Sequence, residues 1–443
     1  MRQFKLTSLA ALSLTVLQNT AHAQTTRAPV AQYWVDISTS SMMGMDEMPN
    51  MGGLGGMMAG MMNKSATGRD GKQATGVGNF GQTKAGFMGR NMDTALFTSR
   101  KPAGTEAVHT VPANAGLGAE PLRLVTPPRE GLQGSRDEVD YPERPQVRIL
   151  FYWGCSAQVK SGQPRVFDTA KLSQQDYSNF MQGRSVRDRG AKAEPGHAIW
   201  PNEQQNSKIV RNASLVGEHS VVGEGIPANM RFTLSEGQDF MPTLDVNTAG
   251  KLSDPIRISW QSIPTARAYM HTALSGGADS KGGGTEMVIW SSSEPPESGM
   301  GLMDYISNSN IDKWLGERAL LPASATQCDI PAGIFEKSQA AMLRSIAYGS
   351  EANFSYPSRP ANLAANAAFT PDWAVRVRSK SVAMNVLGQD SSMGQRGNRT
   401  RNAPANQPQN QQGQPAQEQR TPGLLDVLPV PGVGGLLKGL FGN

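Results

Sequence analysis

The sequence predicts a mainly β protein, an antiparallel β-sandwich with a few short helices and long disordered segments. Short segments that alternate apolar and polar residues recur along the chain, and a period of two is that of a half-buried strand. The clearest example, residues 256–275, has two such segments on either side of Pro264 and Thr265, as in a β-hairpin. The 48 glycines and 29 prolines, against 6% aromatic residues, indicate that much of the remaining chain is loop or low-complexity sequence.

Residues 1–23 have the pattern of a cleavable signal peptide. Arg2 and Lys5 precede a short apolar core, and Ala21 and Ala23 form a small-x-small cleavage site before Gln24. An apolar core of this length is too short to span about 30 Å of hydrocarbon, so we expect cleavage and not a retained membrane anchor. The protein is therefore expected to be exported, and to be periplasmic, associated with the outer membrane, or secreted.

The remaining chain is close to charge balance. Removing Arg2 and Lys5 from the 42 Lys and Arg residues leaves 40 against 37 Asp and Glu, a net charge of +3. No basic stripe interleaved with aromatic residues is visible, so nucleic acid is not an expected partner. At about 150 residues per domain, the length allows two or three domains.

Two cysteines, Cys155 and Cys328, remain in the exported chain. In an oxidising compartment they can form a disulfide that ties the N-terminal half of the chain to the C-terminal half. The alternative is two buried thiols that never meet. Both interpretations stay open, because a bridge requires Cα atoms within about 7 Å and the sequence does not show that distance.

Residues 24–135 are expected to supply N-terminal strands, interrupted at residues 41–91 by a disordered insertion rich in Met and Gly. Three interpretations of its methionines remain open. They lie in a flexible insertion, they flank a small-residue helix face suited to close packing, or their thioethers bind a soft metal such as Cu(I) or Ag(I). The last interpretation resembles, in composition, the Met-rich segments of periplasmic copper-handling proteins. Its candidate ligands are Met42, Met43, Met45, Met48 and Met51.

Residues 136–205 begin with a charged connector and continue with a central strand and a short helix. The strand, residues 147–153, is the most apolar in the chain and is therefore predicted to lie centrally in its sheet. Residues 165–167 are predicted to return as its antiparallel partner. A helix is predicted from Ser173, with Gly183 ending it.

Residues 206–388 carry most of the predicted strands. In residues 373–379, Trp373, Val375 and Val377 are expected to face inward, and Arg376 and Arg378 outward. A helix is expected to start at Asn310 or Asp312, and residues 339–348 fit either a strand or a helix. Further strands are predicted earlier and later in the chain, at residues 32–38, 94–100, 122–125, 214–222, 230–234, 240–246, 286–291 and 382–387.

The C-terminal part has two sections of opposite composition. Residues 389–421 are Gln, Asn, Pro and Arg with few apolar side chains, so they are expected to be disordered. Residues 422–443 form an apolar peptide whose leucines can share one helix face. They either contact a membrane surface or fold back on the body of the protein.

Trp260 is followed at three-residue intervals by Ile263, Ala266 and Tyr269. This spacing resembles the fibronectin type III module, in which a Trp on the second strand precedes a Tyr on the third. The segment that begins at Trp373 is similar to the late Tyr-x-Val-x-Val strand of that family, with Trp in the place of Tyr. The resemblance covers residues 256–275 and 373–379. It implies a fibronectin- or immunoglobulin-like sandwich over residues 206–388, with insertions, and a role in binding or spacing.

Catalytic chemistry has little support in the sequence. Glu218, His219 and Ser220 are adjacent on a predicted strand, where neighbouring side chains point to opposite faces and cannot form a relay. Glu294 and Glu297 lie in a Pro-rich loop, where two carboxylates are usually solvated. The histidines, His109, His197, His219 and His271, lack metal-ligand spacing and are expected to be surface or internally satisfied residues.

We therefore expect a non-enzymatic protein of the cell envelope, with a binding or structural role and without a cofactor. Its partner would be an envelope protein, a glycan or a lipid. One alternative is a periplasmic soft-metal binder that uses the Met-rich segment. The other is a secreted hydrolase whose site residues the sequence does not identify.

Overall fold

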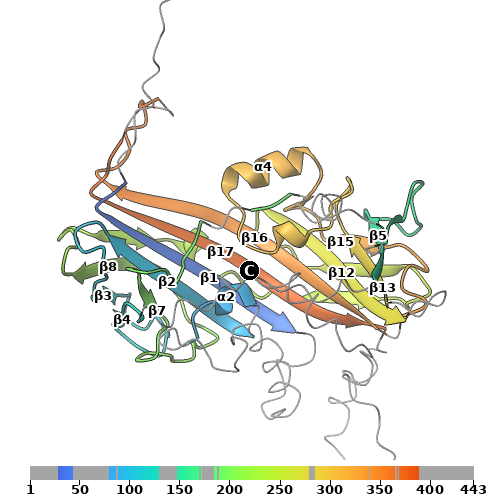
Figure 1. Ribbon diagram of the computed structural model, residues 1–443, viewed down its shortest axis with the longest axis horizontal. Helices are drawn as coiled ribbons and strands as arrows, with labels where there is room; N and C mark the ends of the chain where they lie inside the picture. The colour runs from blue at the N-terminus through green and yellow to red at the C-terminus, as the bar shows by residue number, and fades with distance from the viewer. Residues whose placement is uncertain are drawn as a thin grey trace, which may run out of the picture.

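The computed structural model describes residues 28–42, 79–85, 88–128, 147–168, 171, 184–186, 189–278, 285–338, 340–364, 367 and 369–388. Within these ranges the protein is mainly β, as the sequence predicts, and its strands form one large sheet and two small ones. In Figure 1 the long strands cross the middle of the molecule, and the small sheets lie toward its two ends.

The large sheet contains ten strands and is mixed. Two of its neighbour pairs, β1 with β17 and β5 with β13, are parallel, so the expectation of a wholly antiparallel fold is wrong. Its strands, in spatial order, are β6 (Arg165–Asp168), β5 (Val147–Trp153), β13 (Thr285–Ser291), β12 (Ala268–Ala278), β16 (Ala341–Tyr356), β17 (Trp373–Leu387), β1 (Ala31–Met42), β2 (Gly89–Thr98) and β7 (Ala198–Trp200), with β14 (Leu321–Pro322) paired to β12.

Both small sheets are antiparallel. The four-stranded sheet has the order β4 (Leu122–Leu124), β3 (Ala107–Thr110), β8 (Gly217–Gly223) and β9 (Arg231–Leu234). The three-stranded sheet has the order β10 (Val246–Ala249), β11 (Ile256–Trp260) and β15 (Gln327–Ile330). Several antiparallel sheets are thus present, as predicted.

The two small sheets cover the same face of the large sheet. Along β17, Val375 and Val377 belong to the apolar core shared with the four-stranded sheet. Ala383 and Leu387 belong to the core shared with the three-stranded sheet. All four positions are odd-numbered, and alternate residues of a strand lie on one face. The long strand therefore carries one continuous inner face that both small sheets cover.

The opposite face of the large sheet is covered by α4 (Asn308–Gly316). Ser307 caps this helix by accepting a hydrogen bond from the Asn310 amide. Its Ile311 and Trp314 pack on β12, β16 and β17 in a separate apolar cluster. The other helices are short: α2 (Gln82–Ala85) and the 3-10 turns η2 (Glu236–Gln238) and η3 (Met300–Leu302).

A β-bulge in β16 shifts its register with β17. The register with β17 shifts between Tyr348 and Glu351, so that two residues of β16 oppose one of β17. Gly349 lies at this bulge, and a Cβ there would clash with the Ser379 hydroxyl oxygen and come within 2.9 Å of the Met241 sulfur. Glycine therefore allows Ser379 and Met241 to pack against the bulge.

The hairpin predicted for residues 256–275 is wrong in its pairing, although both strands are present. β11 belongs to the three-stranded sheet and β12 to the large sheet, so the turn at Pro264 connects two layers. The strand at residues 147–153 is not central, because only β6 lies beyond it at the sheet edge. Of the strand predicted at residues 240–246, only Val246 lies in a strand.

Several boundaries also differ from the predictions. β2 starts at Gly89, within the segment predicted to be a disordered insertion. β1, β2 and β5 pair in the same sheet as β12, β13, β16 and β17, so the division at residues 205 and 206 does not separate two sheets. The ambiguous segment at residues 339–348 contributes to strand β16. The helix predicted from Ser173, and residues 389–443, lie outside the described residues.

Candidate functional site

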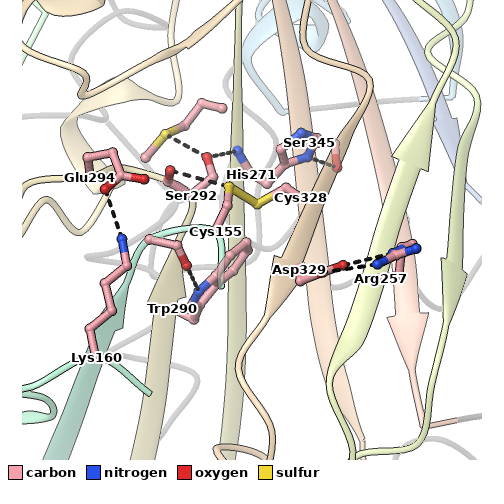
Figure 2. Close-up of a disulfide and its surroundings, with 12 residues drawn as sticks. Cys155, Lys160, Arg257, His271, Trp290, Ser292, Glu294, Cys328, Asp329 and Ser345 are labelled. Carbon is pink, nitrogen blue, oxygen red and sulfur yellow. Dashed lines mark hydrogen bonds and ion pairs between the residues drawn. A yellow bond between two sulfur atoms is a disulfide. The ribbon is translucent and has the colours of Figure 1, made fainter. Parts of the chain in front are cut away.

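A disulfide joins the large sheet to the three-stranded sheet. Cys155 follows β5 directly, Cys328 lies in β15, and their Cα atoms are 4.9 Å apart. The chain after Cys155 then runs beside β15: Ser156 donates its amide to the carbonyl of Asp329 at 2.9 Å. Of the two interpretations that the sequence left open, the structure therefore contains the bridged pair (Figure 2).

His271 lies next to this bridge in the interior. Its Nδ1 is 2.8 Å from the Ser345 hydroxyl, and its ring centroid is 4.3 Å from that of Trp260. Figure 2 shows the imidazole and Ser345 turned toward each other, with the Lys160–Glu294 ion pair farther out. Burial lowers the pKa of His271 to about 3, so the ring is neutral. Since its side chain has 0% exposure, no substrate reaches it.

A second set of buried polar groups joins the large sheet to the four-stranded sheet. Tyr33 of β1 lies 2.8 Å from His109 Nδ1, His109 Nε2 lies 3.0 Å from His219 Nδ1, and His219 Nε2 lies 2.7 Å from the Leu215 carbonyl oxygen. The Phe232 ring stacks on His219 with centroids 5.0 Å apart. Burial lowers the pKa of both histidines. We call these four groups the histidine chain.

His219 and its sequence neighbours Glu218 and Ser220 lie on opposite faces of the sheet, as expected for adjacent residues of a strand. Glu218 lies on the exposed outer face of the four-stranded sheet, where its carboxylate is 3.5 Å from Arg231. His219 points to the inner face. The partner of His219 is thus His109, which is 110 positions earlier in the sequence. Only the pairing of β3 with β8 brings the two rings together.

A buried charged cluster occupies the opposite face of the large sheet. Arg378, predicted to face outward to solvent, is only 3% exposed, because that face is covered as well. It donates two hydrogen bonds of 2.7 Å to Asp36. The Tyr305 ring lies over it, and over Lys380, at centroid distances of 4.5 and 4.4 Å. The cluster therefore fixes the segment around Tyr305 to β1 and β17.

Burial also changes the titration of this region. It lowers the pKa of Lys380 to about 8, and Asp304, 3.7 Å away, opposes that shift. It raises the pKa of Asp93 to about 6, although that carboxylate accepts hydrogen bonds from Gly81 and Thr83. These charges are matched by partners inside the protein, an arrangement that holds segments in place.

Two adjoining hollows lie at one end of the four-stranded sheet and share Glu106; we call them the end hollows. The first has a volume of about 520 Å³, and the Lys101–Glu224 ion pair lies at its rim. The second has a volume of about 360 Å³ and an apolar floor that includes Val222, which is 51% exposed. Their other lining residues are Ala103, Gly104, Thr105, Ala107, Val108, Arg123, Leu124, Val125, Thr126 and Gly223.

The two carboxylates considered for glycoside chemistry do not form a pair. Glu294 binds Lys160 at 2.8 Å on the surface. Glu297, predicted to be solvated, is 2% exposed; its carboxylate accepts hydrogen bonds from the amides of Arg184 and Gly299. The buried acid therefore anchors a loop and does not face solvent.

Of the candidate metal ligands, only Met42 is described. It ends β1, opposite Met384, and is partly buried; Met43, Met45, Met48 and Met51 lie outside the described residues. In the described part of the chain, no group of three or more His, Cys, Asp or Glu side chains is placed to hold a metal ion. The helices described there include none long and apolar enough to cross a membrane.

Comparison with known proteins does not extend these observations to a family. No protein-family model matches this sequence, and no curated protein is significantly similar to it.

Proposed function

We propose that this chain is an exported, disulfide-stabilised protein of the cell envelope that binds another protein and performs no catalysis. The observation that carries the proposal is the bond between Cys155 and Cys328 across two layers of the fold. Such bonds persist in oxidising compartments and are rare in the reducing cytosol of most organisms. The signal-peptide pattern of residues 1–23 supports the same compartment.

The state of the polar side chains favours binding over catalysis. His109, His219 and His271 are each at most 1% exposed and are neutral, and their hydrogen bonds go to groups of the same fold. A general base must reach the proton that it removes. The buried acids Asp36 and Glu297 likewise have arginine partners, so the secreted-hydrolase alternative has no residue set to support it within the described part of the chain.

The end hollows supply the proposed contact surface. Val108 and Val222 face each other across β3 and β8 and form a small apolar floor. Lys101, Glu106 and Glu224 give this floor a charged rim of both signs. An apolar centre inside a polar rim is the usual anatomy of a protein–protein contact. We therefore favour a protein partner over a glycan or a lipid.

The resemblance to fibronectin type III modules fits this role. Trp260 and Tyr269 pack with ring centroids 5.4 Å apart, and the Tyr269 hydroxyl accepts a hydrogen bond from the amide of Ile263. We propose that residues 256–275 form the core of a module of this type, in which the large sheet and the three-stranded sheet are the two layers. Many unrelated modules with this architecture bind proteins.

Export is tested on the full-length chain expressed in a bacterium. We expect the mature N-terminus at Gln24, and we expect an alkylating reagent to label Cys155 and Cys328 only after reduction. A chain without residues 2–23 should stay in the cytosol with both thiols free. An unprocessed N-terminus, or free thiols in the exported protein, would contradict the proposal.

Binding is tested with two exposed valines on different strands. Val222→Glu places a charge on the floor of the end hollows, and Val166→Glu places one on β6, at the far edge of the large sheet, where Val166 is 49% exposed. Envelope proteins cross-linked to the native chain should be lost with Val222→Glu and kept with Val166→Glu. Equal capture by both variants would exclude this surface.

A further inference from the structure

The histidine chain has a defined direction. A carbonyl oxygen can only accept, so His219 Nε2 must donate to Leu215. A neutral imidazole then has an acceptor at His219 Nδ1, which requires His109 Nε2 to be the donor. His109 Nδ1 is in turn an acceptor, and the Tyr33 hydroxyl donates a hydrogen bond to it. In this arrangement both neutral rings carry their proton on Nε2.

The chain has little capacity for an additional proton. A proton on His219 Nδ1 would face the N–H of His109 unless the whole chain reversed. Reversal would turn the Tyr33 hydroxyl proton away from His109 and toward Thr94, inside a core where Tyr33 is 1% exposed. A second proton would place two buried imidazolium rings 5.2 Å apart, centroid to centroid.

The charged groups around the histidine chain do not compensate for the cost of adding a proton to it. Asp239 acts to raise the pKa of His219, but burial outweighs it, and its Oδ1 already accepts the Leu215 amide at 2.8 Å with Arg90 beside it. Asp36 of β1 lies on the opposite face of the large sheet, in the buried charged cluster. Glu218 and Arg231 of the small sheet pair on its exposed outer face, and Arg123 of β4 is exposed there too.

We propose that the histidine chain is an acid-sensitive latch that releases the four-stranded sheet from the large sheet when the pH falls below about 6.5. The chain is the buried, titratable part of the polar contact between these layers: Tyr33 lies in β1, and the two histidines lie in β3 and β8. The Val125–Ile199 backbone bridge and the hydrogen bond from Thr98 to the Gly225 carbonyl also join them, and neither of these titrates. Opening exposes both rings to water. In the open state each ring titrates with the ordinary pKa of about 6.5.

The direction of the pH effect follows from the lowered pKa values in the closed state. Well above pH 6.5 neither state binds an extra proton, so the histidine chain contributes its full free energy to the closed state. As the pH falls below 6.5, the open state takes up more protons than the closed state. At pH 5 each histidine favours opening by at most about 30-fold, and the two together by at most about 1,000-fold.

Hydrogen–deuterium exchange of the full-length, oxidised protein tests the latch. Between pH 8 and pH 5, after correction for intrinsic rates, protection of β3 and β8 should fall by up to about 1,000-fold. Protection of β11 and β15 should fall by no more than about 30-fold, because one neutral histidine, His271, lies in that half. An equal fall in both small sheets would overturn the proposal, since it would indicate global opening.

Two variants sharpen the measurement. His219→Gln removes one titrating ring and should reduce the fall in β3 and β8 to no more than about 30-fold. His197→Gln is the matched control: this histidine packs on Trp34 and Phe97, away from the chain, and the fall should stay as in the native protein. An unchanged fall in His219→Gln would also overturn the latch.

Ring nitrogen chemical shifts of the native protein provide a test that does not depend on the variants folding. At pH 8 both His109 and His219 should show the Nε2–H tautomer. A proton on Nδ1 of either ring would contradict the directed chain on which the latch rests.

Discussion

The two small sheets cover the same face of the large sheet, but each is attached to it by different chemistry. The three-stranded sheet is attached through the covalent bond between Cys155 and Cys328. The four-stranded sheet is attached through hydrogen bonds: the Val125–Ile199 backbone bridge, and the buried contacts of 2.8 to 3.0 Å among Tyr33, His109 and His219. The apolar cores beneath the two sheets are similar in kind, so the disulfide on one side and the buried histidine pair on the other are what distinguish the two halves.

This difference predicts different responses to the surroundings. A disulfide is insensitive to moderate acid but is lost under reducing conditions. Neutral buried histidines tolerate reduction but oppose folding in acid, because protonation requires them to reach water. Reduction should therefore act on the disulfide-bonded half, whereas acid should act more strongly on the half that contains two buried histidines than on the half that contains one.

The largest effect is expected from removing the covalent attachment. Replacing both cysteines, Cys155→Ser with Cys328→Ser, frees a loop of 173 positions and should lower the free energy of unfolding by about 4 to 5 kcal/mol. Chemical denaturation of the oxidised native chain and the double variant measures this difference.

The part of the fold that loses stability when the disulfide is removed tests the comparison more specifically than the total loss does. In the double variant, amide protection should fall more in β11 and β15 than in β3 and β8. A uniform loss across both small sheets, or an unchanged free energy of unfolding, would show that the disulfide does not hold one layer in particular.

A smaller effect concerns the pH dependence of the disulfide-bonded half. Its His271 has a pKa of about 3 in the folded protein, against about 6.5 when unfolded. A histidine with a lowered folded pKa contributes its full stability above about pH 6.5, and this contribution falls as the pH decreases toward 3. At pH 5 the decrease is about 2 kcal/mol.

His271→Gln should therefore reduce the difference in unfolding free energy between pH 7.5 and pH 5 by about 2 kcal/mol, whatever its effect at neutral pH. Urea denaturation at the two pH values measures this difference. If the difference stays as in the native chain, His271 is not neutral in the folded state.

The smallest effect is expected at the surface beside the disulfide. Glu294 and Lys160 bind at 2.8 Å, but their side chains are 44% and 38% exposed. Glu294→Gln should change the free energy of unfolding by less than about 0.5 kcal/mol, since solvent screens exposed pairs. A loss above about 1 kcal/mol, seen by the same denaturation assay, would show that this pair also holds the layer.

Local patterns made many strands predictable. The alternation around Val375 identified β17 and its inner face, and Ile311 and Trp314 identified the buried face of α4. The order of the strands was not predictable, because alternation does not specify a partner. The apolar segment at residues 147–153 suggested a central strand, although both of its faces are covered near the edge of the sheet.

The candidate sites were less predictable, for the same physical reason. Arg378 looked like a solvent-facing residue, because the sequence does not show that Asp36 and Tyr305 lie over it. The pairing of His109 with His219 depends on contacts between strands that are distant in the sequence. Long-range pairing has no local pattern, whereas the two cysteines could at least be recognised as possible partners.

The parallel pairing of β1 with β17 has a consequence for the order of folding. The first strand of the described chain lies between β2 and β17, and Asp36 meets an arginine 342 positions later in the sequence. An N-terminal strand that leaves the ribosome or the translocation channel first must wait for almost the whole chain before its sheet is complete. Such non-local contacts slow folding. The large sheet should therefore be completed only after β17 has been released, and on the export route proposed above the chain would still be unfolded while it crosses the membrane.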